Sequence, residues 1–286
     1  MKIYRDINSL KLAIMEIKQN SQTIGFVPTM GFLHKGHISL IEGSKNNNNN
    51  TVVSIFVNPL QFGLGEDYEK YPRDEQMDLS ILRQNKVDVV FLPTSEEMYR
   101  DTHFTKISVK TLTEVLCGLK RPGHFDGVCT VIAKFLNIIR PDNVYFGLKD
   151  YQQYIVVKKM VADLNFDVNI VGMSIIRDND GLALSSRNSY LSDEERQSAL
   201  SLSKSFSIVE NFLREGCFIS SDIKKAIYYF IASHKHTRID YIEIVDVETL
   251  KNIDHIKTPF LLALAVFVGK TRLIDNKIFD LKNYKY

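Results

Sequence analysis

The sequence has little cysteine, no long hydrophobic run and almost no excess of charge of either sign. Its three cysteines are odd in number and have no CxxC spacing, so neither a disulfide framework nor a cysteine zinc site is supported and a cytoplasmic location is expected. The longest apolar run, Phe260 to Val268, is about half the ~20 residues that a membrane helix needs, and it indicates a buried strand. The opening segment lacks the apolar core and the cleavage site of a signal peptide. We therefore expect no membrane association.

The charges are balanced. The 36 lysine and arginine residues against 34 aspartate and glutamate residues leave a formal net charge of +2 over 286 residues. Proteins that bind the nucleic-acid backbone usually carry a clear basic excess, so no nucleic-acid partner is expected and any phosphate site must be local. With 44% hydrophobic and 24% charged residues, the chain can bury a large core, which excludes disorder as its main state.

Strand and helix patterns alternate along the first part of the chain. Short apolar runs that end at proline or glycine indicate strands, and apolar residues at a 3.6-residue period indicate helices. We expect strands at 24–27, 51–57, 87–92 and 144–146, with helices at 10–17, 34–44, 74–84, 130–139 and 151–162. This alternation predicts an α/β fold with a Rossmann-like parallel sheet, whose ligand lies beyond the carboxyl ends of the strands.

The pattern changes after residue 176. Helices are expected at 192–214 and 220–233, followed by strands at 239–245 and 260–268. This order predicts a smaller α+β domain. We therefore expect a Rossmann-like domain at 1–176 and a C-terminal α+β domain at 177–286. The low-complexity run Asn46 to Asn50 is expected to be a solvated loop.

The segment PTMGFLHKGH, residues 28–37, places two histidines at the start of a predicted helix. His34 and His37 are three residues apart, so they share a helix face beside backbone amides that favour phosphate. Each imidazole can donate a hydrogen bond to a phosphate oxygen without a fixed positive charge. The alternative is one capping histidine and one surface histidine; a zinc site is less favoured, because there is no HExxH.

A resemblance to a known family rests on this segment and on further blocks that follow in order. They are VSIFVNPLQFG (53–63), YPR (71–73), RPGHFDGV (121–128), GLKDYQQ (147–153) and GLALSSRN (181–188). Together the blocks resemble pantothenate synthetases, the pantoate–β-alanine ligase family within the nucleotidylyltransferase superfamily that carries the HxGH signature. The resemblance continues through 239–247 and 271–276, so it covers essentially the whole chain.

The resemblance implies a two-step reaction. ATP, with Mg²⁺, activates the carboxylate of pantoate to give pantoyl adenylate and pyrophosphate. β-Alanine then attacks the adenylate and releases pantothenate and AMP. The family also implies a homodimer in which the C-terminal domain acts as a lid.

Roles for individual residues follow from the same resemblance. The catalytic residues would be His34, His37, Lys149, Ser185, Ser186 and Arg187. These six would also bind ATP, together with Met30, Gly31, Gly147, Asp150, Ile176 and Leu184. Pantoate would be bound by Asn58, Gln61 and Gln153, with Arg121 and His124 near the same mouth. Asp78 is the candidate Mg²⁺ ligand in an acidic stretch that Met77 interrupts, and Leu148 stands where the family usually has glutamate.

Two other functions are weighed against this one. A nucleotidyltransferase that leaves the nucleotide on its product would use the same histidines, but it would need neither the pantoate amides nor a path for an amine. A nucleic-acid-binding module without enzymatic activity is poorly supported by the net charge of +2.

Overall fold

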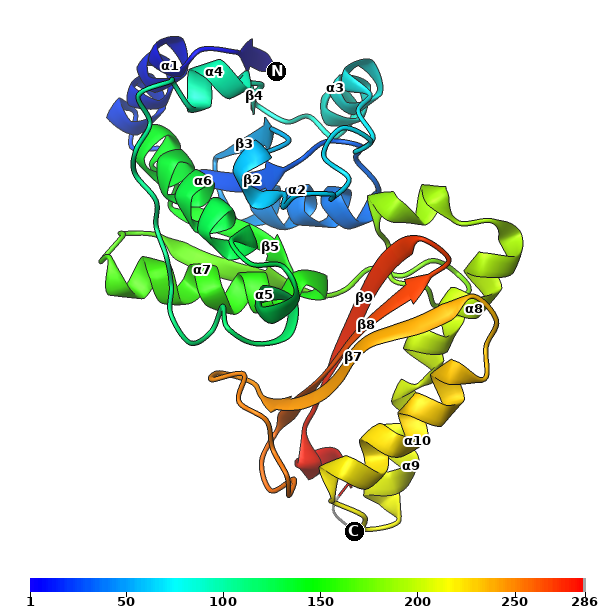
Figure 1. Cartoon of the computed structure of the whole chain (residues 1–286). Helices are drawn as coiled ribbons and strands as arrows, with labels where there is room; N and C mark the ends of the chain where they lie inside the picture. Colours follow the sequence, from blue (N-terminus) through cyan, green and yellow to red (C-terminus); the bar gives the residue numbers. More distant parts are fainter. Residues whose placement is uncertain (285–286) are drawn as a thin grey trace. The chain divides into compact units, whose positions relative to one another are not determined.

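The computed structural model shown in Figure 1 describes residues 1–284. The chain divides into two compact units. The first unit comprises Met1–Thr113, Gly118–Leu148 and Gln153–Ser174. The second unit comprises the chain from Ile175 on, together with two short segments from earlier in the sequence, Glu114–Cys117 and Lys149–Gln152.

The first unit is built on a six-stranded parallel sheet, which confirms the predicted fold class. The strand order is β1-β4-β3-β2-β5-β6, with pairing such as Val27 beside Val53. The strands are β1 (Lys2–Tyr4), β2 (Ile24–Thr29), β3 (Asn50–Ile55), β4 (Val89–Phe91), β5 (Asn143–Gly147) and β6 (Asn169–Met173). After β2 the order runs toward one edge and after β5 toward the other, so a topological switch point lies between β2 and β5.

Helices cover both faces of this sheet (Figure 1). On one face, Ile41 of α2 (Lys35–Asn47) and Leu82 of α3 (Glu75–Gln84) share a core with Val27 and Val53. On the other, Phe135 of α6 (His124–Ile139) meets Phe26 edge-on at 5.4 Å. Successive strand residues thus face opposite helix layers, as a parallel sheet buried on both sides requires. The remaining helical elements are α1 (Ile7–Gln19), η1 (Pro59–Gln61), α4 (Ser95–Met98), α5 (Leu116–Lys120), η2 (Leu148–Asp150) and α7 (Tyr151–Asp163).

The asparagine run differs from its prediction as a solvated loop. Helix α2 continues to Asn47 and β3 begins at Asn50, so the connection is only two residues long. The half-buried Asn48 side chain donates to Ser44 O and Tyr145 Oη at 2.8 and 2.9 Å. The run therefore forms the ends of two elements, because its amides satisfy backbone and side-chain groups of the sheet layer.

The second unit contains a three-stranded antiparallel sheet in the order β7-β8-β9. The strands are β7 (Thr237–Asp246), β8 (Phe260–Val268) and β9 (Thr271–Phe279). Helices α8 (Asp193–Lys204), α9 (Phe206–Arg214) and α10 (Ser220–Ala232) share a core with alternate residues of β8, among them Leu262 and Leu264 (Figure 1). The predicted strand at 260–268 is confirmed as buried. The predicted single helix at 192–214 is instead two helices that meet at Ser205.

Two short helical elements complete the second unit, η3 (Ser186–Tyr190) and η4 (Leu281–Tyr284). Among residues 1–284, none of the helices combines the length and the apolar character needed to cross a membrane.

Candidate active site

The loop between β2 and α2 turns sharply before the histidines. Thr29 Oγ1 donates to Ser54 O at 2.7 Å and accepts the amide of Gly31 at 3.2 Å. Gly31 then has φ +79° and Phe32 φ +50°, so two consecutive residues are left-handed. A Cβ on Gly31 would come within 2.8 Å of Asp78 Oδ2. Glycine is required at position 31 by the backbone conformation and by this close approach.

The two histidines both cap the start of α2. His34 is the N-cap, and its Nδ1 accepts the amide of Gly36 at 3.1 Å. His37 Nδ1 accepts the amide of His34 at 3.2 Å, which completes a capping box. The ring centroids are 4.1 Å apart. Because each Nδ1 is an acceptor, each neutral ring carries its proton on Nε2, so the pair presents two N–H donors from the start of one helix.

The predicted Mg²⁺ ligand, Asp78, is held by this loop. Asp78 is 1% exposed, and its two carboxylate oxygens accept hydrogen bonds from the amides of Phe32 and Leu33 at 2.8 and 2.7 Å. Burial raises the pKa of the Asp78 carboxyl; the amides of Leu33 and Phe32 oppose that rise, and nearby Asp74 adds to it.

This geometry does not fit a metal ligand. Mg²⁺ needs accessible oxygen atoms in a nearly octahedral set that usually includes several waters, whereas both Asp78 oxygens are buried against backbone amides. Among the residues that the structure describes, no group of three or more histidine, cysteine, aspartate and glutamate side chains is placed to hold a metal ion.

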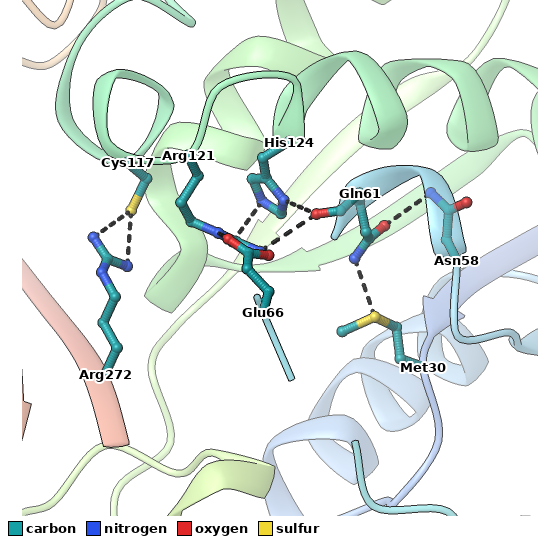
Figure 2. A network of polar contacts seen from close by, with 8 residues as sticks. All are labelled: Met30, Asn58, Gln61, Glu66, Cys117, Arg121, His124 and Arg272. Atoms are coloured by element: carbon teal, nitrogen blue, oxygen red, sulfur yellow. Dashed lines mark hydrogen bonds and ion pairs between the residues drawn. The ribbon is translucent and has the colours of Figure 1, made fainter. Parts of the chain in front are cut away.

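The predicted pantoate-binding amides Asn58 and Gln61 lie together beside Met30 (Figure 2). Asn58 is 1% exposed; its Oδ1 accepts from Tyr99 Oη and Leu60 N, and its Nδ2 donates to Gly127 O and Gln61 Oε1. The hydrogen-bonding capacity of Asn58 is therefore used within the protein. Gln61 Nε2 instead donates to Met30 Sδ at 3.0 Å, and a thioether is only a weak acceptor.

An ion pair next to these amides holds the main chain of Gln61. Arg121 binds Glu66 through two bonds of 2.7 and 2.6 Å (Figure 2). His124 Nδ1 donates to Gln61 O at 2.8 Å, so in the neutral ring Nε2 accepts from Arg121 Nη1 at 3.0 Å. Burial opposes the charged form of Glu66, but the hydrogen bond and charge of Arg121, with smaller help from Gly63 and His124, lower the pKa of this carboxyl.

Two partners in this network are not expected from the sequence. Glu66 and Tyr99 lie in segments that carry no motif, and each meets its partner across more than forty residues of sequence. No sequence signal identifies such pairs. Arg121 and His124, which the resemblance places near the mouth of the site, do lie next to Gln61.

A cavity of about 250 Å³ lies in the first unit beside the histidine loop. Residues that line it include Gly31, Arg73 and three carboxylates, Asp74, Glu75 and Asp78. Asn58 and Gln61 are not among its lining residues, and neither is Gln153, which is half-buried in the first turn of α7.

In the second unit, Lys149 and Asp150 form the end of η2, which follows β5 and Gly147. Lys149 Nζ lies 3.1 Å from Asp150 Oδ2, and Lys149 O accepts from Asn276 Nδ2 at 2.7 Å. Leu148 belongs to the first unit, where its Cδ2 would lie 2.7 Å from a Cβ placed on Gly172. Its side chain therefore packs over β6, which accounts for an apolar residue at this position.

The remaining predicted ATP residues are joined by a small hairpin of the second unit. Leu184 N donates to Ile176 O at 3.0 Å, so these two residues are direct neighbours. Ser185 follows as the N-cap of η3, and its Oγ accepts the amide of Arg187 at 3.3 Å. Ser186 is buried at the start of η3. The hairpin is anchored by paired hydrogen bonds of 2.6 and 2.9 Å from Arg177 to Asp275, together with ion pairs of Arg196.

Comparison with known proteins places this chain in a family. The sequence profile described as Pantoate-beta-alanine ligase matches residues 2–278. The pantothenate synthetase of Caldicellulosiruptor bescii is 49% identical over 282 residues, which cover 99% of this chain and 100% of that protein. The crystal structure of pantothenate synthetase from Thermus thermophilus has a TM-score of 0.92 and 40% identity, covering 98% of this chain and 99% of that one.

A further solved structure carries ligands. It is the pantoate-beta-alanine ligase of Francisella tularensis complexed with Beta-gamma ATP and Beta-alanine, with a TM-score of 0.80 and 36% identity over 99% of this chain and 98% of that one. The sequence matches extend over nearly the full length of both partners, and the fold agrees with them throughout. This chain therefore belongs to the pantoate–β-alanine ligase family.

Proposed function

We propose that the protein condenses pantoate with β-alanine through a pantoyl adenylate, consuming ATP and releasing pyrophosphate and AMP. A free carboxylate is a poor acceptor for an amine, because its leaving group would be oxide. An acyl adenylate offers AMP as the leaving group instead, so activation must come first. The observation that carries the proposal is the histidine pair at the start of α2, whose two Nε2–H donors suit the oxygens of a triphosphate.

The first unit would serve the adenylation step. The Nε2–H groups of His34 and His37 would stabilise negative charge that develops on the phosphates as pyrophosphate leaves. Gln61 would bind pantoate, since a substrate oxygen is a stronger acceptor than the Met30 sulfur that now receives its Nε2–H. Gln153 would be the second pantoate-binding amide. Asn58 would act through Gln61, because its own polar atoms are all bonded within the protein.

The second unit would supply further groups for ATP. Lys149 would neutralise phosphate charge, and the hydroxyls of Ser185 and Ser186 with the guanidinium of Arg187 would bind the triphosphate. Ile176 and Leu184, joined by a backbone hydrogen bond, offer apolar contact to adenine. Asp150 would accept a ribose hydroxyl. The second unit would act as a lid.

We propose that Mg²⁺ binds together with the triphosphate. When bound, it would neutralise part of the triphosphate's negative charge. Within residues 1–284, no group of three or more histidine, cysteine, aspartate and glutamate side chains is placed to hold it, and both oxygens of Asp78 accept backbone amides. The expectations of a homodimer and of a cytoplasmic location also remain proposals; light scattering on the purified protein tests the first.

Pyrophosphate exchange tests the order of the chemistry. With Mg²⁺, ATP and pantoate but no β-alanine, the enzyme should exchange labelled pyrophosphate into ATP, because none of the proposed adenylation residues requires the amine. Exchange that starts only when β-alanine is added would contradict the stepwise mechanism. Exchange supported by CTP and not by ATP would favour a nucleotidyltransferase that keeps the nucleotide on its product.

A further inference from the structure

The loop that presents the histidines has a conformation that needs outside support. A non-glycine residue with left-handed backbone costs roughly 1–2 kcal/mol, and Phe32 has φ +50° directly after Gly31 at φ +79°. Such strain persists only where neighbouring groups hold the backbone in place. Leu33 comes next, and then His34, the N-cap of α2.

Asp78 supplies that support. The amides of Phe32 and Leu33 point in one direction and form a concavity of the kind that binds anions. The anion in this concavity is the Asp78 carboxylate, with one oxygen at 2.8 Å from the first amide and the other at 2.7 Å from the second. Two charge-assisted bonds from a rigid helix therefore fix the loop one residue before His34.

We propose that Asp78 is a positioning residue, which fixes the loop that carries His34 and His37, and is not a ligand of Mg²⁺. The proposal rests on the proposed role of the two histidines in adenylation. Asp78 acts through backbone alone: it holds two amides, the loop places His34, and His34 with His37 closes the capping box that orients both rings.

The substitution Asp78→Asn separates the two roles. Asparagine has the same shape but turns one acceptor into an N–H donor, which would face a backbone N–H. We expect turnover in pyrophosphate exchange to fall about 10²-fold, the size of effect that a small misplacement of reacting groups produces. The pantoate KM and the Mg²⁺ concentration for half-maximal rate should each stay within about threefold of the wild type, because on this proposal Asp78 binds backbone amides and neither ligand.

Asp88→Asn is the control for loss of a carboxylate that accepts a backbone amide, although Asp88 is exposed and Asp78 is buried. Asp88 Oδ2 also accepts a backbone amide, that of Thr51 at 2.8 Å, but it lies just before β4 and away from the histidine loop. This variant should keep wild-type turnover. AMP release by the wild-type protein with pantoate and β-alanine is measured first. A wild-type protein without this activity would contradict the proposed function. The role of Asp78 would then be decided by the metal-binding test below.

Three results would overturn the proposal. The first is an Asp78→Asn enzyme with turnover within about threefold of the wild type. The second is an Asp78→Asn enzyme whose rate returns in excess Mg²⁺. The third is an Asp78→Glu enzyme with wild-type turnover, because glutamate keeps a metal ligand but its extra methylene moves the carboxylate away from the two amides.

A metal-binding test by NMR uses the wild-type protein, so it decides the question even if neither variant folds. Mn²⁺ is added to the 15N-labelled protein without nucleotide, and the broadening of the amide signals is measured. The amide signals of Phe32 and Leu33 should broaden no more than those of Thr51, which is bound by the control carboxylate. Selective broadening of the Phe32 and Leu33 signals that persists when Asp74 and Glu75, which line the same cavity, are changed to Asn and Gln would place the metal at Asp78 and overturn the proposal.

Discussion

At the scale of single residues, each histidine of the proposed site has a structural task beside the chemical one proposed for it. His37 Nδ1 caps α2 by accepting the amide of His34, while its Nε2–H is the donor proposed for phosphate. His37→Ala should therefore lower turnover by roughly 10² to 10³ and also lower stability by about 1 kcal/mol. His37→Gln keeps an acceptor for the capping box, so it should recover stability in urea unfolding while turnover stays low. Equal stability of the two variants would show that the cap contributes little.

The ion pair of Glu66 and Arg121 makes stability depend on pH. Because the pKa of folded Glu66 lies below its usual value of 4.5, its contribution is fully present above that value and is lost as the pH falls through the lowered pKa. Glu66→Gln should cost about 1–3 kcal/mol near neutral pH, since it removes a carboxylate bonded to a half-buried guanidinium. Urea midpoints should show this difference holding down to about pH 5 and shrinking as the pH falls further, below the usual pKa of 4.5. A constant difference would contradict the lowered pKa.

At the scale of elements, the junction of α2 and β3 is a packed connection. Asn48 donates to Ser44 O and Tyr145 Oη, and its Oδ1 accepts from Asn143 at 2.7 Å. Asn48→Ala should lower the free energy of unfolding by roughly 2–3 kcal/mol, because it leaves half-buried groups without partners. Asn46→Ala, at an exposed position of the same run, should stay within about 0.5 kcal/mol of the wild type. Equal effects of the two substitutions on urea unfolding would instead support the expectation that the run is a solvated loop.

The strands that could be predicted are those with apolar residues on both faces. β2, β3 and β8 have dense apolar sequences, and the sequence predicts them close to their true bounds. It does not predict β6 and β9, because Gly172 interrupts the first and the charged residues Arg272, Asp275 and Lys277 interrupt the apolar pattern of the second. In the candidate site, the sequence segment 28–37 predicts the histidine pair. The contacts of Asp78 and Asn58 cannot be predicted in this way, because their partners are distant in sequence and only folding brings them close.

At the scale of the whole molecule, the second unit is assembled from three stretches of sequence. Cys117 N donates to Gln152 at 2.9 Å, and Cys117 Sγ lies 3.2 Å from Tyr241 Oη and 3.6 Å from both terminal nitrogens of Arg272 (Figure 2 shows Arg272 beside this thiol). A fragment that starts at Ile175 lacks Cys117 and Gln152. It should unfold at lower urea concentration and less cooperatively than the same residues in the full chain, as hydrogen exchange would report. A fragment as stable as the intact unit would show that the two segments contribute little.

The order in which the ribosome makes these parts has a consequence for the nascent chain. All six strands of the first sheet have been synthesised once residue 173 is added, so that sheet can form early. The segments at 114–117 and 149–152 must then wait for β7, which carries Tyr241, and for β9, which carries Arg272 and Asn276. The roughly 100 residues in between take about 5 to 20 s to translate. During that interval the growing protein exposes unpaired polar groups and a thiol, and this is the period in which chaperone contact would matter most to it.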